Sequence, residues 1–183
     1  MFAGKRVVVV GSNNSALDIV QDPSDALVVQ GYASLFGMPD QSGDVVQPGA
    51  YKASLKKRSS DRAPVKMLWQ HDPTQPIGVW DQVYEDEKGL FVKGRILKEI
   101  QTGREALALV EAGAVDGLSI GYRTVKSKKN NKGGRDLKEL DLWEVSLVTF
   151  PMLPEARVTP MSNGQLVSEL ADVIAEARRE LLG

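Results

Sequence analysis

Three side chains of this sequence are candidates for nucleophilic attack and proton transfer: Ser119, His71 and Glu144. His71 is the only histidine among the 183 residues, so proton transfer by an imidazole near neutral pH can use no other side chain. The chain has no cysteine, which excludes thiolate nucleophiles, disulfides and thiolate metal sites. A serine hydroxyl attacks poorly until a base takes its proton, and His71 could be that base for Ser119.

Ser119 lies in a segment, 117–122, that alternates as a β-strand does. Leu118 and Ile120 share one predicted face, and Ser119 points the other way with Gly121. The two glycines of this segment leave room for another backbone or a substrate to approach. The segment is not the G-x-S-x-G nucleophile elbow, which needs a sharp strand-to-helix turn. The alternative is that Ser119 is a small residue that fills a tight position in a sheet.

Glu144 interrupts an apolar run, 142–148, whose two faces are both largely apolar, which is typical of a central strand. A carboxylate buried there needs a partner, because an unpaired buried charge is costly. The partner could be His71 or an arginine, and the pair could be purely structural. Asp72 and Asp141 are competing acids for His71. In an extended strand Asp72 would point away from its neighbour His71, and Asp141 would lie on the face opposite Glu144.

The hydrophobic pattern predicts the elements that would position these side chains. A capping box at Thr102–Glu105 predicts the start of a helix and Gly113 its end. His71 would close its strand on the same face as Met67 and Trp69, and the polar stretch 126–135 predicts a mobile loop. Strands are predicted at 27–35, 65–71, 77–84, 89–97, 118–125 and 140–150, and the other helices at 48–58 and 164–182.

The last of these helices, 164–182, is amphipathic and is expected to bury its apolar stripe. The predicted organisation is an N-terminal extension at 1–26, a core domain at 27–160 and a C-terminal helix at 161–183. Strands dominate, so the predicted fold class is mainly β, a barrel or curved sheet with flanking helices.

Composition excludes several function classes. The net charge is −1, from 23 basic and 24 acidic residues, so nothing indicates nucleic acid or an anionic membrane as a partner. No apolar run approaches the 18 or so residues of a transmembrane helix. With one histidine and no cysteine, a multi-histidine zinc site is impossible, and neither a cofactor nor a metal is predicted.

Successive segments of the chain resemble, in order, the motifs of the phage prohead (head-maturation) protease family. Each motif is weak alone, and together they cover roughly residues 27–160. The family is similar to the herpesvirus assembly proteases, so the resemblance implies a largely antiparallel, seven-stranded β-barrel ringed by helices. The segments are 31–34, 43–51, 68–72, 76–78, 89–90, 117–122 and 144–151.

The resemblance implies roles for particular residues. The family's catalytic histidine corresponds to His71 and its serine to Ser119. The third member of the herpesvirus triad is a second histidine, which this chain lacks, and Glu144 occupies the corresponding spacing after the serine. A carboxylate there could fix the tautomer of His71 and stabilise the imidazolium. Arg157, in a following loop, is the candidate for stabilising the oxyanion.

The function implied by the resemblance is that of a serine endopeptidase of phage capsid maturation. Its expected substrates are scaffold protein or a scaffolding segment of the capsid protein, and the protease itself. It would act inside the prohead, in the cytoplasm of the infected bacterium, and could form a homodimer. The alternative is a catalytically silent assembly protein that uses the same domain to bind capsid or scaffold segments.

Overall fold

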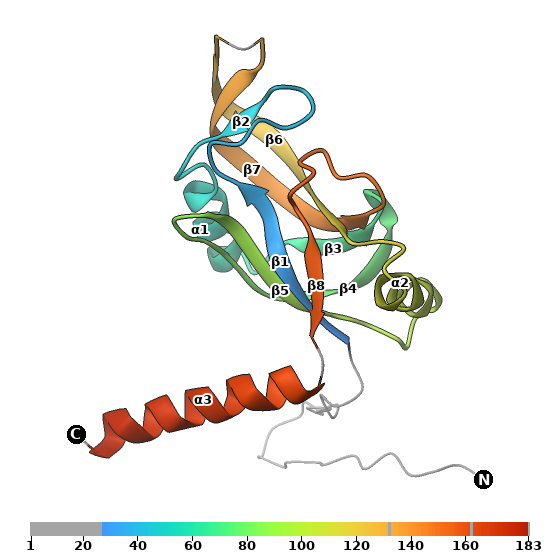
Figure 1. Cartoon of the computed structure of the whole chain (residues 1–183). Helices are drawn as coiled ribbons and strands as arrows, with labels where there is room; N and C mark the ends of the chain where they lie inside the picture. Colours follow the sequence, from blue (N-terminus) through green and yellow to red (C-terminus); the bar gives the residue numbers. More distant parts are fainter. Residues whose placement is uncertain (1–26, 132, 162, 183) are drawn as a thin grey trace.

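The fold is one large β-sheet with helices beside it, seen in a computed structural model that describes residues 27–131, 133–161 and 163–182 (Figure 1). The strands follow the order β2-β7-β3-β4-β5-β1-β8, with β6 on the other edge of β7, and this path does not close on itself. The mainly β class with flanking helices is therefore confirmed, whereas the expected closed barrel of seven strands does not form: the eight strands make an open sheet. The predicted extension at 1–26 lies outside the described residues. The elements are β1 Leu27–Leu35, β2 Val45–Val46, α1 Lys52–Ser60, β3 Lys66–Trp69, β4 Asp72–Glu85, β5 Gly89–Ile96, α2 Gln101–Glu111, β6 Gly117–Lys129, β7 Arg135–Val148, β8 Val158–Met161 and α3 Asn163–Leu182.

The strand β7 is the centre of the part of the sheet that matters for function. It pairs antiparallel with β6 and parallel with β3 and β2. Leu142, Val145 and Leu147 are completely buried in the core. The prediction of a central strand is thus confirmed, because a strand with neighbours on both edges and cover on both faces tolerates little polar surface.

The predicted mobile loop at 126–135 is wrong. The strand β6 continues to Lys129, which pairs with Arg135 at the start of β7. These residues are polar because this end of the hairpin is exposed to solvent, and the backbone ladder forms regardless of side-chain polarity.

The first two helices begin elsewhere than the sequence predicts. The helix α1 starts at Lys52 rather than at 48, since Gly49 has a φ of 90° in a preceding turn. The capping box of α2 does not form: the N-cap is Ile100, and the hydroxyl of Thr102 bonds to Gln75 instead. Gly113, with a φ of 70°, follows the end of α2 as expected. Both helices pack on β4, α1 also on β7 and α2 also on β5.

The C-terminal helix α3 forms as predicted, but the two large residues of its apolar stripe that are described, Val173 and Ile174, are not buried in this chain. It projects away from the sheet after β8 (Figure 1). Val173 and Ile174 are 62% and 59% exposed, which contradicts the expectation that they face an interior. The side chains of Leu166, Leu170 and Leu181 lie outside the described residues. The reason for the difference is that the helix leaves the core instead of folding back onto it.

Candidate active site

His71 lies in the tight turn between β3 and β4. Trp69 pairs with Asp72, so Gln70 and His71 are the two residues of the hairpin loop. Their φ angles are 52° and 63°, the positive pair that a type I′ turn requires. The prediction that His71 ends a strand is therefore wrong, because the chain reverses at Gln70. Non-glycine residues in this conformation are strained, which demands compensation from neighbouring groups.

Hydrogen bonds from β7 and the residue after it supply that compensation. The amide of Gln70 donates to the carbonyl of Leu147 at 3.0 Å. The side-chain amide of Gln70 donates to the Thr149 hydroxyl at 2.8 Å and accepts from the Thr149 amide at 3.2 Å. The amide of His71 donates to the hydroxyl of Ser146 at 3.1 Å. The turn is thus fastened along its whole length to β7, which fixes the position of the imidazole.

His71 and Glu144 form a short hydrogen bond. The distance from His71 Nδ1 to Glu144 Oε1 is 2.6 Å. A carboxylate can only accept, so Nδ1 carries the hydrogen and Nε2 is the ring nitrogen left to act as a base. The side chain of Glu144 is 11% exposed, whereas that of His71 is 42% exposed. The pair therefore joins a buried acid to an accessible base, and Glu144 has His71 rather than an arginine as its partner.

The competing acids face elsewhere. Asp72 accepts hydrogen bonds from the amide and the hydroxyl of Thr74, two residues along its own strand. Asp141 accepts from the indole of Trp143 at 3.0 Å and lies beside Arg58. The indole hydrogen bond and the nearby arginines hold the pKa of Asp141 below its usual range.

Ser119 lies directly across from Ser146 in the β6–β7 ladder, and Gly121 lies across from Glu144. Opposed residues in such a ladder share a face, so Ser119 points to the same side of the sheet as the Glu144 carboxylate. A side chain at Gly121 would collide with that carboxylate, since an added Cβ would meet Glu144 Oε1 and Cδ. Ser119 is 5% exposed, and no hydrogen bond links it to His71 within the described residues. Catalytic hydrogen bonds are often long without substrate, so this geometry is compatible with a nucleophile and its base.

A cavity of about 180 Å³ opens beside Ser119. Its walls are apolar where β1 and β6 approach each other, and polar at the loop before β2. The lining residues are Ala33, Ser34, Leu35, Met38, Asp40, Ser42, Asp44, Val46, Leu118, Ser119, Ile120, Tyr122, Arg135, Met152 and Leu153.

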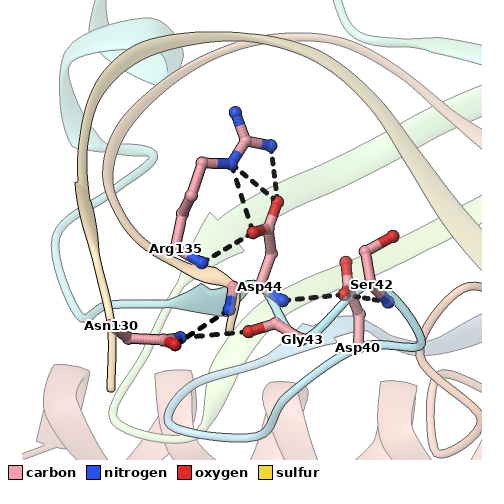
Figure 2. A network of polar contacts seen from close by, with 7 residues as sticks. Asp40, Ser42, Gly43, Asp44, Asn130 and Arg135 are labelled. Atoms are coloured by element: carbon pink, nitrogen blue, oxygen red, sulfur yellow. Dashed lines mark hydrogen bonds and ion pairs between the residues drawn. The ribbon is translucent and has the colours of Figure 1, made fainter. Parts of the chain in front are cut away.

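The polar wall of this cavity is a closed network around Asp44 (Figure 2). The guanidinium of Arg135 holds the Asp44 carboxylate with distances from 2.5 to 3.2 Å, and the Arg135 amide donates to it at 2.8 Å. Asp40 accepts from the amides of Ser42 and Asp44, and Asn130 donates to the Gly43 carbonyl. Hydrogen bonding to Arg135 holds the pKa of Asp44 below its usual range.

Arg157 immediately precedes β8 and lies beside the start of β6, but its side chain binds other groups. Its guanidinium binds Asp116 and the carbonyl of Pro154, and its backbone forms a bridge to Gly117. Arg157 therefore lies close to the strand that carries Ser119, with its side chain bound to Asp116.

Two further features bear on function. Within 27–131, 133–161 and 163–182, no group of three or more histidine, cysteine or acidic residues could hold a metal ion. Across that same part of the chain, none of the helices has the length and apolar character needed to cross a membrane.

The sequence profile of the Caudovirus prohead serine proteases matches residues 15–168. The chain belongs to this family. It is 32% identical over 149 residues to the prohead protease of Enterobacteria phage HK97, covering 80% of this chain and 65% of that protein. It is 29% identical over 157 residues to the capsid polyprotein of Pseudomonas phage PAJU2, covering 81% of this chain and 22% of the polyprotein. This prohead protease family member thus spans less than two thirds of those two relatives.

The fold agrees with the solved structure of a phage capsid assembly protease. The capsid assembly protease of bacteriophage T4 superimposes with a TM-score of 0.55 at 14% identity, covering 80% of this chain and 92% of that one. The KSHV protease superimposes with a TM-score of 0.48 at 13% identity, covering 82% and 77%.

Sequence reasoning missed two parts of the site. Ser146 bonds to both Glu144 and His71, and its signal was its position two residues after Glu144, which places both on one face of β7. The Asp44–Arg135 pair joins residues 91 positions apart, and nothing in the local sequence of either one indicates it.

Proposed function

We propose that this prohead protease family member is a serine endopeptidase in which Ser119 is the nucleophile, His71 the general base and Glu144 the acid that orients His71. The observation that carries the proposal is the placing of Ser119 on the same face of the sheet as a buried Glu144 bonded to an accessible His71. The bond to Glu144 leaves Nε2 of the imidazole free to take a proton.

The chemistry follows from these three roles. Ser119 Oγ attacks the carbonyl carbon of the peptide bond while His71 Nε2 takes the hydroxyl proton, and Glu144 stabilises the imidazolium. The protonated His71 then gives its proton to the leaving amine, which leaves an acyl-enzyme that water hydrolyses by the same route. Arg157 stays the proposed oxyanion donor, and to act it would have to exchange Asp116 for the oxyanion.

The proposed substrates come from the relatives' names and from the family. Relatives include a prohead protease, a capsid polyprotein and probable capsid maturation proteases of Lactococcus phages. We infer that this chain cleaves scaffold protein or a scaffolding segment of the capsid protein, and itself, inside the prohead. The cavity beside Ser119 would receive a substrate side chain. A homodimer through the exposed stripe of α3 is a further proposal, which the mass in solution of a chain lacking residues 164–183 would test.

The decisive experiment compares Ser119→Ala with Ser127→Ala, an exposed serine on the same strand. Each variant is co-expressed with the capsid and scaffold proteins of the same phage, and each is treated with a fluorophosphonate. Attack by Ser119 on this probe forms an O–P bond, expels fluoride and passes the proton to His71. Ser119→Ala should lower cleavage by at least about 10³-fold, with no label on its 119-containing peptide. Ser127→Ala should behave as wild type. Normal cleavage by folded Ser119→Ala would overturn Ser119 as the nucleophile, whereas a folded wild-type chain that neither cleaves nor takes the label would leave a binding protein as the function.

A further inference from the structure

Ser146 occupies the junction between the acid and the turn that carries the base. Its side chain is completely buried, and its hydroxyl makes two hydrogen bonds. It donates to Glu144 Oε2 at 2.6 Å and accepts from the amide of His71 at 3.1 Å. A serine hydroxyl has one donor and two lone pairs, so both bonds can form at once.

We propose that Ser146 is a positioning residue that sets the plane of the Glu144 carboxylate and ties it to the His71 turn. The inference rests on the proposed function, because it assigns Ser146 a task within that catalytic arrangement. Ser146 is two residues from Glu144 on the same face of β7, and it is the cross-strand neighbour of Ser119.

The carboxylate needs such a constraint because its last torsion is a broad rotor with no sharp minimum. Two partners on two oxygens define a plane: His71 Nδ1 on Oε1 and Ser146 Oγ on Oε2. Because Gly121 has no side chain, the Glu144 carboxylate can occupy the space beside it. Without Ser146, a single hydrogen bond to His71 would hold one oxygen, and the group could turn about it.

The second bond couples this orientation to the backbone of the base. The amide that Ser146 accepts belongs to His71, whose φ is 63°. The same hydroxyl therefore fixes the acid and supports the strained turn from which the imidazole projects. Ser146 acts on the reaction only through Glu144 and His71, so its loss should alter the state of the imidazole as well as the rate.

Ser54 provides a matched control for a buried hydroxyl with a purely structural task. It lies in α1 and is 5% exposed, and its hydroxyl oxygen accepts a hydrogen bond at 2.9 Å from the amide of Leu142, which is on β7 as Ser146 is. The hydrogen bonds of Ser54 go to the backbone of Leu142 and not to Glu144. Ser54→Ala and Ser146→Ala thus each remove one buried hydroxyl that bonds to a backbone amide, and only the second change touches the carboxylate.

The first test reads the tautomer of His71 without using turnover. Because the chain has one histidine, imidazole ¹⁵N spectra contain a single set of signals. In a Ser119→Ala background, neutral His71 should carry its proton on Nδ1. Adding Ser146→Ala should shift the signals toward the Nε2–H tautomer, and adding Ser54→Ala should leave them unchanged. Identical spectra with and without Ser146→Ala would overturn the proposal.

The second test uses the wild-type nucleophile and the fluorophosphonate probe. Ser146→Ala should slow labelling of Ser119 by about 10- to 100-fold, as expected for a group that orients a triad without touching substrate. Ser146→Cys, which keeps the shape and a weak donor, should fall between serine and alanine, and Ser54→Ala should stay within about twofold of wild type. Circular dichroism checks folding. An unchanged labelling rate in Ser146→Ala would overturn the proposal, whereas labelling or cleavage that survives Ser119→Ala would overturn the catalytic assignment instead.

Discussion

Among the described residues, Asp44 and Glu144 are the two buried acidic residues, and the contrast between them shows how burial relates to chemistry. Asp44 is 6% exposed and Glu144 is 8% exposed. Both carboxylates are fully hydrogen-bonded, as buried charges must be. Asp44 is held by the guanidinium and the backbone amide of Arg135, whereas Glu144 is held by a histidine and a serine hydroxyl.

The partners decide what each acid can do. The Arg135 guanidinium stays positively charged at any pH the protein meets. The Asp44–Arg135 ion pair therefore has a structural role, linking β7 to the loop before β2 (Figure 2). An imidazole exchanges its proton under ordinary conditions, so Glu144 is bonded to a group whose charge can change during a reaction. Burial alone thus marks acids that need partners, and a titratable, accessible partner distinguishes Glu144, the acid that we propose for catalysis.

The sharpest way to break this contrast is to neutralise each acid in turn. Glu144→Gln should lower cleavage by about 10²- to 10³-fold, because the uncharged amide no longer stabilises the imidazolium. This loss is smaller than that of acid-to-amide changes in some other triads. Asp44→Asn should lower fluorophosphonate labelling of Ser119 by less than about threefold, because Asp44 does not touch His71 and this small probe places no substrate side chain in the cavity. Cleavage and labelling rates of the two variants, beside Asp72→Asn and Asp141→Asn, measure the difference. If Asp72→Asn or Asp141→Asn is inactive while Glu144→Gln is fully active, the acid is wrongly assigned.

A smaller effect is expected from adding a methyl group beside each of the two acidic residues. A Cβ at Gly121 would collide with Glu144 Oε1, and one at Gly134 would collide with the backbone of Gly43 and Asp44. Gly121→Ala should reduce fluorophosphonate labelling by about 10- to 100-fold by displacing the acid. Gly134→Ala should lower the free energy of unfolding by about 1–3 kcal/mol and leave labelling near wild type. Equal labelling rates in the two folded variants would contradict the contrast.

The smallest expected effect is on stability, and it depends on pH. Hydrogen bonding to Arg135 lowers the pKa of Asp44 in the folded state, so the pair stabilises the protein above the ordinary carboxyl pKa. That contribution is lost as the pH falls through the lowered pKa of the folded state. Asp44→Asn should therefore cost about 1–2 kcal/mol of unfolding free energy at neutral pH, and the two proteins should converge in acid. Urea unfolding at pH 7 and pH 3 measures the difference in unfolding free energy between the wild type and Asp44→Asn. If the pair contributes nothing, this difference will be the same at both pH values.

The sequence predicts much of this arrangement because several of its features are local. Strand alternation predicted that Ser119 points to the face opposite Leu118 and Ile120. The apolar segment around Glu144 predicted a buried acid that needs a partner. These inferences use only the period of a strand and the cost of a buried charge. The family resemblance, confirmed by the profile match, supplied the implied roles of His71 and Ser119.

The parts that failed depend on contacts between distant segments. Alternation extended the strand to His71, yet the chain reverses at Gln70 because bonds to Leu147, Ser146 and Thr149 stabilise the turn. The capping box at Thr102 does not form, because the Thr102 hydroxyl makes a hydrogen bond with the distant Gln75 instead. Local patterns cannot register such competition, since the stabilising group lies elsewhere in the chain.

The parallel pairing of β3 with β7 has a consequence for when a newly made chain can act. His71 and Glu144 are 73 residues apart, and they meet only after β7 has been laid beside β3. Non-local pairing of this kind forms late in folding compared with hairpins and helices, because a long loop must close first. A chain still on the ribosome, with its early hairpins formed but β7 not yet in place, holds a histidine without its acid. The order of folding thus delays the meeting of His71 and Glu144 until β7 has joined the sheet, and the proposed catalytic arrangement cannot exist before that point.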